Sequence, residues 1–387
     1  MTVKKLGVLT MEHATGYRDT WAEVNLSSIK KNLQKIREIY PDKYIYAAVK
    51  ANAYGHGYLP VSEAVLEAGA DALAVATLDE ALMLRKNFTE TPILVMGWTR
   101  PQDAPVAAKQ QIQVTAFQQE WLKQAGSYLK DSQEKVKIHM KIDSGMGRIG
   151  IKSRKEAYAV IEEVTNFTDE FELSGIFTHF ATADSAELSY YNKQLKHFED
   201  LLDVFSSIRT PKTQIHIGNT AASMRFPEDM YDAIRFGIGL YGLYPSKDVE
   251  RLSDMTLSES FSLYSSIIHV KKLEPGEHIS YGATYEAEQE EWIGTVPIGY
   301  GDGWIRKLQG FHVLVDGKRS EIVGRICMDQ MMIRLSKPYP IGTKVTLIGE
   351  DQGERIRVDD VADYLETINY EIPCIINERV PRLYLTE

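Results

Sequence analysis

Eight short apolar runs recur between Tyr44 and about Pro245, and polar, helix-like segments separate them. They are YIYAAVK from Tyr44, DALAVA from Asp71, PILVM from Pro92, IQVTA from Ile112, VKIHMKID from Val136, LSGIFTH from Leu173, QIHIGN from Gln214 and AIRFGI from Ala233. Alternating strands and helices imply parallel strands with right-handed crossovers, and eight of them in roughly 200 residues match a (β/α)₈ barrel. An open doubly wound sheet is the competing architecture, although it usually needs fewer strands and a topological switch point.

The sequence pattern changes after Pro245. From about Phe261 onward it consists of short alternating strands and turn signals, including a hairpin turn at Asp316 and Gly317, with VDDVADYLETI as the one good helix candidate. We therefore predict an α/β chain with a TIM-type (β/α)₈ barrel over residues 25–255 and a mostly β domain over residues 256–387. An early strand at the end of residues 1–24 fits the sheet of either domain, the β domain included.

The charge balance argues against a nucleic-acid-binding protein. The chain carries 44 Lys+Arg against 54 Asp+Glu, a net charge of −10, and has no basic stripe. No stretch approaches the roughly 20 apolar residues of a membrane span, and the N-terminal sequence lacks the apolar segment of a signal peptide. Two cysteines, Cys327 and Cys374, are too few for a disulfide framework. We expect a cytoplasmic protein with neither nucleic-acid nor membrane partners.

One lysine occupies an unusual position, in the segment AAVKANAYGHG. Lys50 follows the aromatic and β-branched run that begins at Tyr44, and it precedes a loop rich in small residues. An amine that projects from an apolar floor is partly desolvated, which lowers the pKa of a lysine and leaves neutral amine for Schiff-base chemistry with a carbonyl or with pyridoxal phosphate. A solvated lysine at a sheet edge is the competing interpretation, so the assignment depends on partners elsewhere in the chain.

Polar residues gather at the predicted carboxyl ends of the barrel strands, where barrel active sites lie. They are Lys50, Lys141, His179, Asn219 with Thr220, and Arg235. The segment GIGLYG after the eighth run matches a dinucleotide fingerprint, but Pro245 argues against the helix that this fingerprint needs. Its residues Gly237 and Ile238 instead suit a phosphate held by backbone N–H groups. A Schiff-base lysine, a phosphate loop and an arginine at a pyridine nitrogen are what pyridoxal phosphate requires, and no metal is expected.

Eight segments, in order and spread over nearly the whole chain, resemble the signature segments of bacterial alanine racemases. They are AAVKANAYGHG, MKIDSGMGRIG, HIGNTAASMRF, IRFGIGLYG, ISYGATYEA, VPIGYGDGW, GRICMDQ and TINYEIPC. The resemblance implies a fold-type III enzyme that binds pyridoxal 5′-phosphate and interconverts L- and D-alanine, an isomerase that supplies D-alanine for peptidoglycan. It also implies a head-to-tail homodimer in which each active site takes residues from both chains.

The same resemblance assigns the cofactor contacts. Lys50 resembles the lysine that carries the cofactor, and Arg235, steadied by His216, resembles the partner of its pyridine nitrogen. The remaining cofactor positions are Tyr54, His179, Asn219, Thr220, Gly237, Ile238 and Tyr370. The sequence reads GNT around Asn219 where many relatives have ANS, but threonine keeps the hydroxyl that donates to the phosphate.

The resemblance also assigns the groups that contact the substrate. Tyr281 resembles the second acid/base, donated by the second subunit together with Asp329 and with Met328, whose backbone contacts the substrate carboxylate. Arg148 resembles an arginine near the same carboxylate, and Lys141 matches a lysine that is carbamylated in some relatives and positions that arginine. The gate of the substrate channel falls on Tyr300 and Tyr370, with Arg306, Arg325 and Ile368 further out.

These roles define a two-base reaction. Racemisation removes the α-proton and returns one from the opposite face, so Lys50 and Tyr281 would serve one face each. Arginine has a pKa above about 12 and does not give its proton to a ring nitrogen, so Arg235 should limit side reactions such as transamination.

Other interpretations stay open at this point. A racemase of broader specificity, for serine or lysine, shares the same pattern, and so does a fold-type III decarboxylase, although decarboxylases place a carboxylate by the ring nitrogen. A pyridoxal-phosphate carrier protein would leave the β domain and Tyr281 unexplained. A barrel aldolase that uses Lys50 without a cofactor would lack a yellow chromophore.

Overall fold

The computed structural model describes residues 16–386, which form two compact units. The barrel unit comprises residues 28–53 and 58–259, and the β unit comprises the described residues up to 27, residues 54–57 and those from 260 onward. The short segment 54–57 therefore belongs to the β unit although both of its sequence neighbours belong to the barrel unit.

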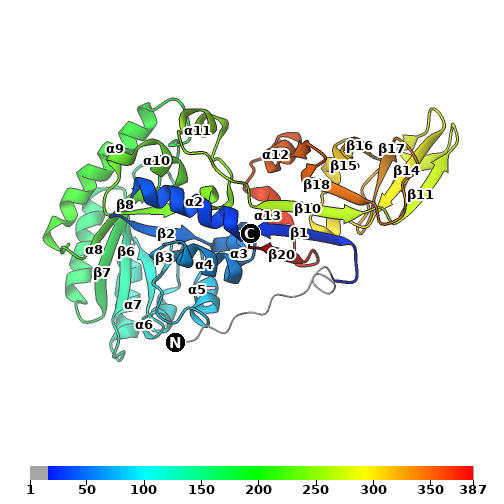
Figure 1. Cartoon of the computed structure of the whole chain (residues 1–387). Helices are drawn as coiled ribbons and strands as arrows, with labels where there is room; N and C mark the ends of the chain where they lie inside the picture. Colours follow the sequence, from blue (N-terminus) through cyan, green and yellow to red (C-terminus); the bar gives the residue numbers. More distant parts are fainter. Residues whose placement is uncertain (1–15, 387) are drawn as a thin grey trace. The chain divides into compact units, whose positions relative to one another are not determined.

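A closed barrel of eight parallel strands forms the centre of the barrel unit, as far as the described residues extend (Figure 1). Its strands are β2 (Tyr44–Ala48), β3 (Ala72–Val75), β4 (Ile93–Val95), β5 (Ile112–Ala116), β6 (Val136–Lys141), β7 (Phe171–Phe177), β8 (Gln214–Gly218) and β9 (Ala233–Phe236). Parallel pairing of β9 with β2 closes it. Each strand falls on one of the eight apolar runs, so the predicted (β/α)₈ barrel is confirmed.

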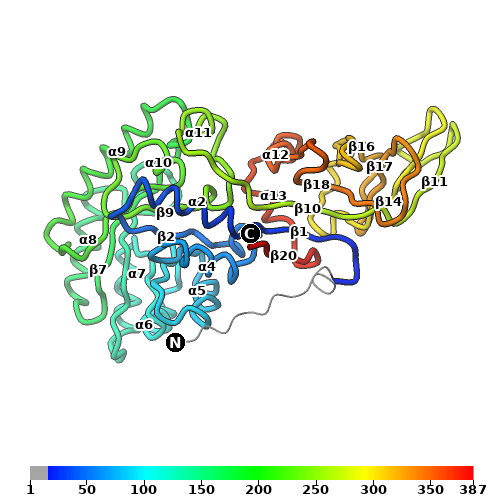
Figure 2. The backbone as a smooth tube through the Cα atoms, in the orientation of Figure 1, coloured from blue at the N-terminus to red at the C-terminus, as the bar shows by residue number. Residues whose placement is uncertain are grey.

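The helices of the barrel unit alternate with its strands along the chain, beginning with a helix before β2 (Figure 2). They are α2 (Leu26–Ile39), α4 (Tyr58–Glu67), α5 (Leu78–Arg85), α6 (Ala104–Lys109), α7 (Gln119–Leu129), α8 (Arg154–Asn166), α9 (Ser189–Leu202), α10 (Thr220–Arg225) and α11 (Lys247–Leu252). The sequence marks several of their starts with side-chain caps. Thr77 and Glu80 form a capping box on α5, and Ser153 and Asn219 cap α8 and α10.

One large aromatic side chain packs among small side chains inside the barrel. Tyr46 lies fully buried in a cluster with Ala72, Ala74, Leu94 and Ala233. Because three of these neighbours are alanines, the Tyr46 ring has room inside a barrel whose strands are buried along almost their whole length. The barrel is therefore a packed core, and its carboxyl-end loops are left to build a site.

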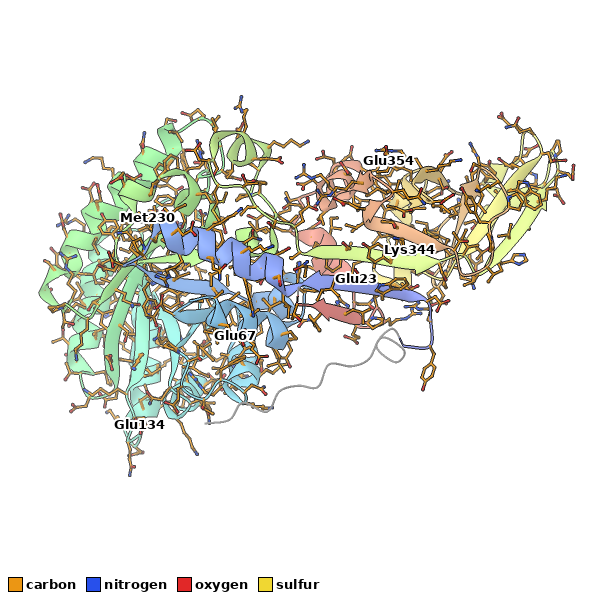
Figure 3. The ribbon with its side chains drawn as sticks, viewed as in Figure 1. Glu23, Glu67, Glu134, Met230, Lys344 and Glu354 are labelled. Atoms are coloured by element: carbon orange, nitrogen blue, oxygen red, sulfur yellow. The ribbon has the colours of Figure 1, made fainter. Side chains whose placement is uncertain are left out.

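A sheet of ten strands, counted over residues 16–386, organises the β unit. The strands are β1 (Thr20–Asn25), β10 (Phe261–Ser266), β11 (His269–Leu273), β14 (Glu291–Val296), β15 (His312–Val315), β16 (Lys318–Val323), β17 (Met331–Leu335), β18 (Lys344–Asp351), β19 (Glu354–Ile356) and β20 (Arg382–Leu385). The early strand β1 joins this sheet, antiparallel to β10 and parallel to β20. Its buried and half-exposed side chains alternate, and Glu23, labelled in Figure 3, is one of the half-exposed ones.

The local predictions for the β unit hold at two places and miss a third. Asp316 and Gly317 have φ values of 55° and 69° and connect β15 to β16, as the hairpin signal predicted. The predicted helix is α12 (Val358–Leu365). A second helix, α13 (Glu371–Ile375), was not predicted, because its five residues are too few to show a helical period. A two-stranded ribbon of β12 (His278–Ile279) and β13 (Tyr285–Glu286) completes the unit.

Candidate active site

The residues singled out on the barrel strands lie at the carboxyl ends of those strands. Lys141 is the last residue of β6, and Arg235 is the third of the four residues of β9. His179 lies two residues after β7, Asn219 directly follows β8, and Lys50 lies two residues after β2. One mouth of the barrel therefore carries the whole set.

Lys50 opens a left-handed turn, where the sequence suggested the last residue of a strand. β2 ends at Ala48, and residues 51–54 all have φ between 51° and 53°. Each non-glycine residue in this region costs about 1–2 kcal/mol relative to a right-handed one, so the turn needs support from its surroundings. Glu80 supplies part of it, because its carboxylate accepts the Ala51 N–H at 2.6 Å.

Arg235 is fixed by an almost complete set of acceptors. Its Nη1 donates to Nδ1 of His216 at 3.0 Å and to the His216 carbonyl at 2.9 Å. Its Nη2 donates to the Thr178 carbonyl at 2.8 Å, with the His179 ring and the Ile217 carbonyl at longer range. Within residues 16–386, the Nε–H is the one guanidinium donor without an acceptor. Burial lowers the pKa of Arg235 to about 9, so the group stays charged at neutral pH.

A second histidine, which the sequence did not indicate as a site residue, continues this network. Since Arg235 only donates, His216 accepts at Nδ1 and donates from Nε2 to Nδ1 of His139 at 2.9 Å. The His216 ring stacks on Phe177 at 4.8 Å between centroids. A Cβ on Gly175 would lie 2.3 Å from His139 Nδ1, so a glycine is needed here. Burial and the Arg235 charge lower the pKa of His139 to about 3, and both rings are neutral.

The barrel mouth is electrostatically unbalanced. Lys141 is 4% exposed and its Nζ lies 4.3 Å from the centroid of the Phe177 ring. Burial, followed by the charges of Arg235 and Arg148, lowers the pKa of Lys141 well below its usual value. Among the described residues, Asp143 is the only carboxylate whose charge raises the pKa of Lys141. An excess of positive charge of this kind favours an anionic ligand.

The loop that carries Arg148 is held by one buried carboxylate. Oδ1 of Asp143 accepts the N–H groups of Gly145 at 3.1 Å and Gly147 at 2.9 Å. A parallel bridge between Ile142 and Ile151 closes the base of the loop. Arg148 thus projects, exposed, from a loop whose backbone is anchored at both ends.

The loop after β9 offers backbone N–H groups, as its glycines suggested. The Gly237 N–H donates to the Thr220 hydroxyl at 2.9 Å, so that hydroxyl can donate onward to a ligand. The N–H of Ile238, at the start of a short 3₁₀ helix (Ile238–Tyr241), has no acceptor within the described part of the chain. A Cβ on Gly239 would come within 2.9 Å of Thr220, so the glycine allows the close approach of this loop to α10.

Two predicted phosphate contacts lie in the β unit. The rings of Tyr54 and Tyr370 are 6.2 Å apart between centroids. Burial raises the pKa of Tyr54, so its phenol is a hydrogen-bond donor at neutral pH. A Cβ on Gly55 would lie 2.0 Å from the carbonyl oxygen of Pro373, so this glycine lets the 54–57 segment pack directly on α13.

Three further predicted residues of the β unit, Tyr300, Met328 and Asp329, lie on two loops that backbone hydrogen bonds join. Tyr300 N–H donates to the Cys327 carbonyl at 3.0 Å, and Gly301 N–H donates to the Met328 carbonyl at 2.8 Å. The Met328 N–H has no acceptor within residues 16–386. Asp329 accepts from Arg379 at 2.6 Å.

Tyr281 lies on a separate turn, and its side chain is 69% exposed, while Met328 is 53% exposed. Within residues 16–386, no three His, Cys, Asp or Glu side chains form a group that could hold a metal ion. No helix in that range is long and apolar enough to cross a membrane.

Comparison with known proteins covers both units. The model of the alanine racemase N-terminal domain matches residues 24–245, and that of the C-terminal domain matches residues 260–384. The chain is 53% identical to the alanine racemase of Geobacillus stearothermophilus over 369 residues, which are 95% of this chain and 94% of the relative. It is 50% identical to that of Halalkalibacterium halodurans over 381 residues, 97% of each.

Solved structures are similar over the same extent. The alanine racemase from Bacillus anthracis with bound L-Ala-P has a TM-score of 0.93, with 46% identity and 96% of both chains covered. A histidine racemase from Leuconostoc mesenteroides subsp. sake has a TM-score of 0.87, with 32% identity, and covers 97% of this chain and 100% of its own.

Proposed function

Because the chain belongs to the alanine racemase family, we propose that it interconverts L- and D-alanine with pyridoxal 5′-phosphate as cofactor. The observation that carries the proposal is the cluster of cationic groups at the barrel mouth, which faces almost no carboxylate. The family requires two anions at this place, the phosphate of the cofactor and the carboxylate of the substrate.

The residues present fit the cofactor. Among residues 16–386, the hydroxyl of Thr220 and the N–H of Ile238 are donors without an acceptor of their own, as a phosphate needs. The leftover Nε–H of Arg235 suits an aromatic nitrogen that accepts a hydrogen bond. Lys50 opens the turn after β2, and its charge acts on Lys141 and His179 of the same barrel mouth. When bound, the cofactor withdraws electrons from the α-carbon of an amino acid and so makes the α-proton removable.

The chain's own residues hold this group in the following way. Lys50 would carry it through Nζ, and Arg235, oriented by the neutral His216, would donate to its ring nitrogen. Its phosphate would be bound by Tyr54, Thr220, Gly237, Ile238 and Tyr370, and His179 and Asn219 are the remaining residues assigned to it. Since the guanidinium keeps its proton, Arg235 donates a hydrogen bond without protonating the ring.

Two bases move the proton. Tyr281 takes the α-proton of L-alanine at its phenolic oxygen, and Nζ of Lys50 delivers a proton to the opposite face. The reverse direction begins at Lys50 and ends at Tyr281. One base gains a proton while the other loses one, so each turnover leaves their protonation states exchanged.

Arg148 and the N–H of Met328 bind the substrate carboxylate, and a carbamate on Lys141, as in some relatives, would hold Arg148 in place. Tyr300 and Tyr370 restrict the side chain of the substrate to little more than a methyl group. Tyr281, Met328 and Asp329 come from the second subunit of a homodimer, which is consistent with the large exposure of Tyr281 and Met328 in the single chain. Such a subunit would cover side chains that a monomer leaves in water.

The proposal extends to the cell. The enzyme works in the cytoplasm, without nucleic-acid or membrane partners, and its D-alanine is used for peptidoglycan.

A racemisation assay over a panel of amino acids tests this function. Pure enantiomers of alanine, serine, lysine, arginine and histidine are each incubated with the full chain and the cofactor, and the opposite enantiomer is measured by chiral chromatography. Alanine should be fastest and serine slower. Efficient turnover of lysine or arginine would refute the size limit at Tyr300 and Tyr370. Efficient turnover of histidine would instead indicate the activity named for the Leuconostoc neighbour.

A further inference from the structure

The turn that carries Tyr281 has an unusual backbone. Ser280, directly before Tyr281, has φ 68° and ψ −179°. This combination belongs to a region that is essentially restricted to glycine, because a Cβ crowds the backbone there. Gly282 and Ala283, on the other side of Tyr281, also have positive φ values, of 76° and 48°. Tyr281 is thus flanked on both sides by left-handed backbone.

A side-chain hydrogen bond holds Ser280 in this conformation. Its hydroxyl donates to the carbonyl of Arg325 at 2.5 Å, and Sγ of Cys327 lies 3.7 Å from the same hydroxyl. The turn packs closely on the segment it bonds to, because a Cβ on Gly324 would lie 3.0 Å from the Cβ of Ser280. One hydroxyl therefore fastens the Tyr281 turn to residues 324–327, the segment that continues into Met328.

The backbone is what directs the Tyr281 side chain. No hydrogen bond, ring contact or cation contact to this side chain occurs among residues 16–386, and 69% of it is exposed. A fixed turn can still set where the phenol points, because the Ser280 hydroxyl bond holds its start and the Ala283 N–H donates to the Ser280 carbonyl at 3.1 Å across it. Losing that bond releases a conformation that serine does not otherwise favour.

We propose that Ser280 is a positioning residue for racemisation, which places the Tyr281 phenol for proton transfer and sets its distance from the Met328 N–H. The inference rests on the proposed role of Tyr281 as the base for L-alanine. In this proposal the strained backbone of Ser280 serves to orient Tyr281, a function that a serine in an ordinary turn would not have.

Two substitutions at this one position separate strain from hydrogen bonding. Ser280→Ala and Ser280→Gly both lose the hydroxyl, but only glycine accepts φ 68° without a clash. At an ordinary position alanine gives the more stable protein, because glycine has more entropy to lose on folding. Here we expect the reverse order in urea unfolding of the full chain. Ser336→Ala is the matched control, since its hydroxyl bonds to Tyr339 at 3.2 Å, elsewhere in the β unit, and to no other described residue.

The functional readout is directional. In deuterated solvent, initial loss of the α-proton is measured separately from pure L-alanine and pure D-alanine. For Ser280→Ala we expect a loss of about a hundredfold with L-alanine, the usual effect of a displacement of about 1 Å, and a smaller loss with D-alanine. Ser280→Gly should keep more of the L-alanine rate than Ser280→Ala, and Ser336→Ala should keep both rates.

Tyr281→Phe, measured in parallel, distinguishes failure of the Ser280 proposal from failure of the proposed base role of Tyr281. An asymmetric loss for Tyr281→Phe with an equal or absent loss for Ser280→Ala would overturn the role of Ser280 alone. Equal losses with both enantiomers for Tyr281→Phe would overturn the base assignment, and the role of Ser280 with it. An alanine variant more stable than the glycine variant would show that Ser280 is not strained, and would also refute the inference.

Discussion

Because hydrogen bonds link Arg235 through His216 to His139, we expect a double variant of the two histidines to be more stable than the single variant at His216. We consider His216→Leu, His139→Leu and the combination of both. Leucine is close to histidine in volume but neither donates nor accepts a hydrogen bond. The variants therefore remove network atoms without opening a large cavity.

Counting unpaired buried atoms gives the magnitudes. In the native network one atom, Nε2 of His139, lacks a partner among the described residues. His216→Leu adds two, a donor of Arg235 and the Nδ1 of His139, which costs about 2–6 kcal/mol at about 1–3 kcal/mol for each atom. His139→Leu removes one unpaired atom and creates another, on His216, so its network cost is near zero.

The double variant leaves only the Arg235 donor unpaired. Adding His139→Leu to His216→Leu should therefore restore about 2–6 kcal/mol, although the same change alone restores nothing. The lost stacking of His216 on Phe177, about 0.5–1.5 kcal/mol, affects the single and the double variant alike.

Hydrogen exchange of the β6 and β8 amides, followed by mass spectrometry on the full chain, measures the opening free energy of the barrel for all four proteins. A coupling energy of the predicted sign would support the network as drawn. If the two single effects simply add, the tautomers inferred from Arg235 are wrong, and His139 packs as an ordinary core side chain.

Three other predictions follow from the site. In Lys50→Ala, borohydride reduction in the presence of the cofactor should leave no lysine modified on peptide mapping, and a modified lysine elsewhere would contradict the assignment. Inactive Lys50→Ala and Tyr281→Ala subunits should regain activity when mixed, since a mixed dimer holds one intact site, and no activity after confirmed exchange of subunits would exclude shared sites. Burial and then the Arg235 charge lower the pKa of His139 from 6.5 to about 3, so the unfolded chain binds more protons between these pH values and the free energy of unfolding rises with pH there. His139→Leu should lower the slope of the unfolding free energy against pH by about 1.4 kcal/mol per pH unit. An unchanged slope would mean that His139 is protonated in the fold.

The fold was predictable because the sequence pattern and the packing agree over long stretches. Most residues of the eight barrel strands are buried, so each strand appears as an apolar run, and a helix-like segment follows each. Helix α13 was missed because it is short. The β1 strand could be recognised but not assigned to a sheet, since its pairing with β10 joins residues more than two hundred positions apart.

The candidate site was predictable only where residue type alone suggests chemistry. A lysine, an arginine or a glycine-rich loop after an apolar run attracts notice, but His139 lies inside such a run and looks like a core residue. The left-handed turn after Lys50 has no sequence signal beyond small residues and one asparagine. Ser280 has an even weaker sequence signal, because a glycine is the residue that normally indicates the conformation it adopts. Sequence patterns report average preferences, and these three positions depart from them.

Those departures gather at the two residues proposed to move protons. Ten non-glycine residues in the described chain have positive φ, and six of them are residues 51–54, Ser280 and Ala283. The other four lie at ordinary turns or at a helix end, where such values are common and serve the fold. Left-handed backbone costs free energy at non-glycine residues, so a fold under selection for stability alone would not concentrate it beside Lys50 and Tyr281. A proton-transfer group does need a fixed direction, and a backbone with no alternative conformation supplies one without burying the group itself. The Tyr281 phenol can therefore be exposed in the single chain and still be held in a fixed direction for its proposed proton transfer.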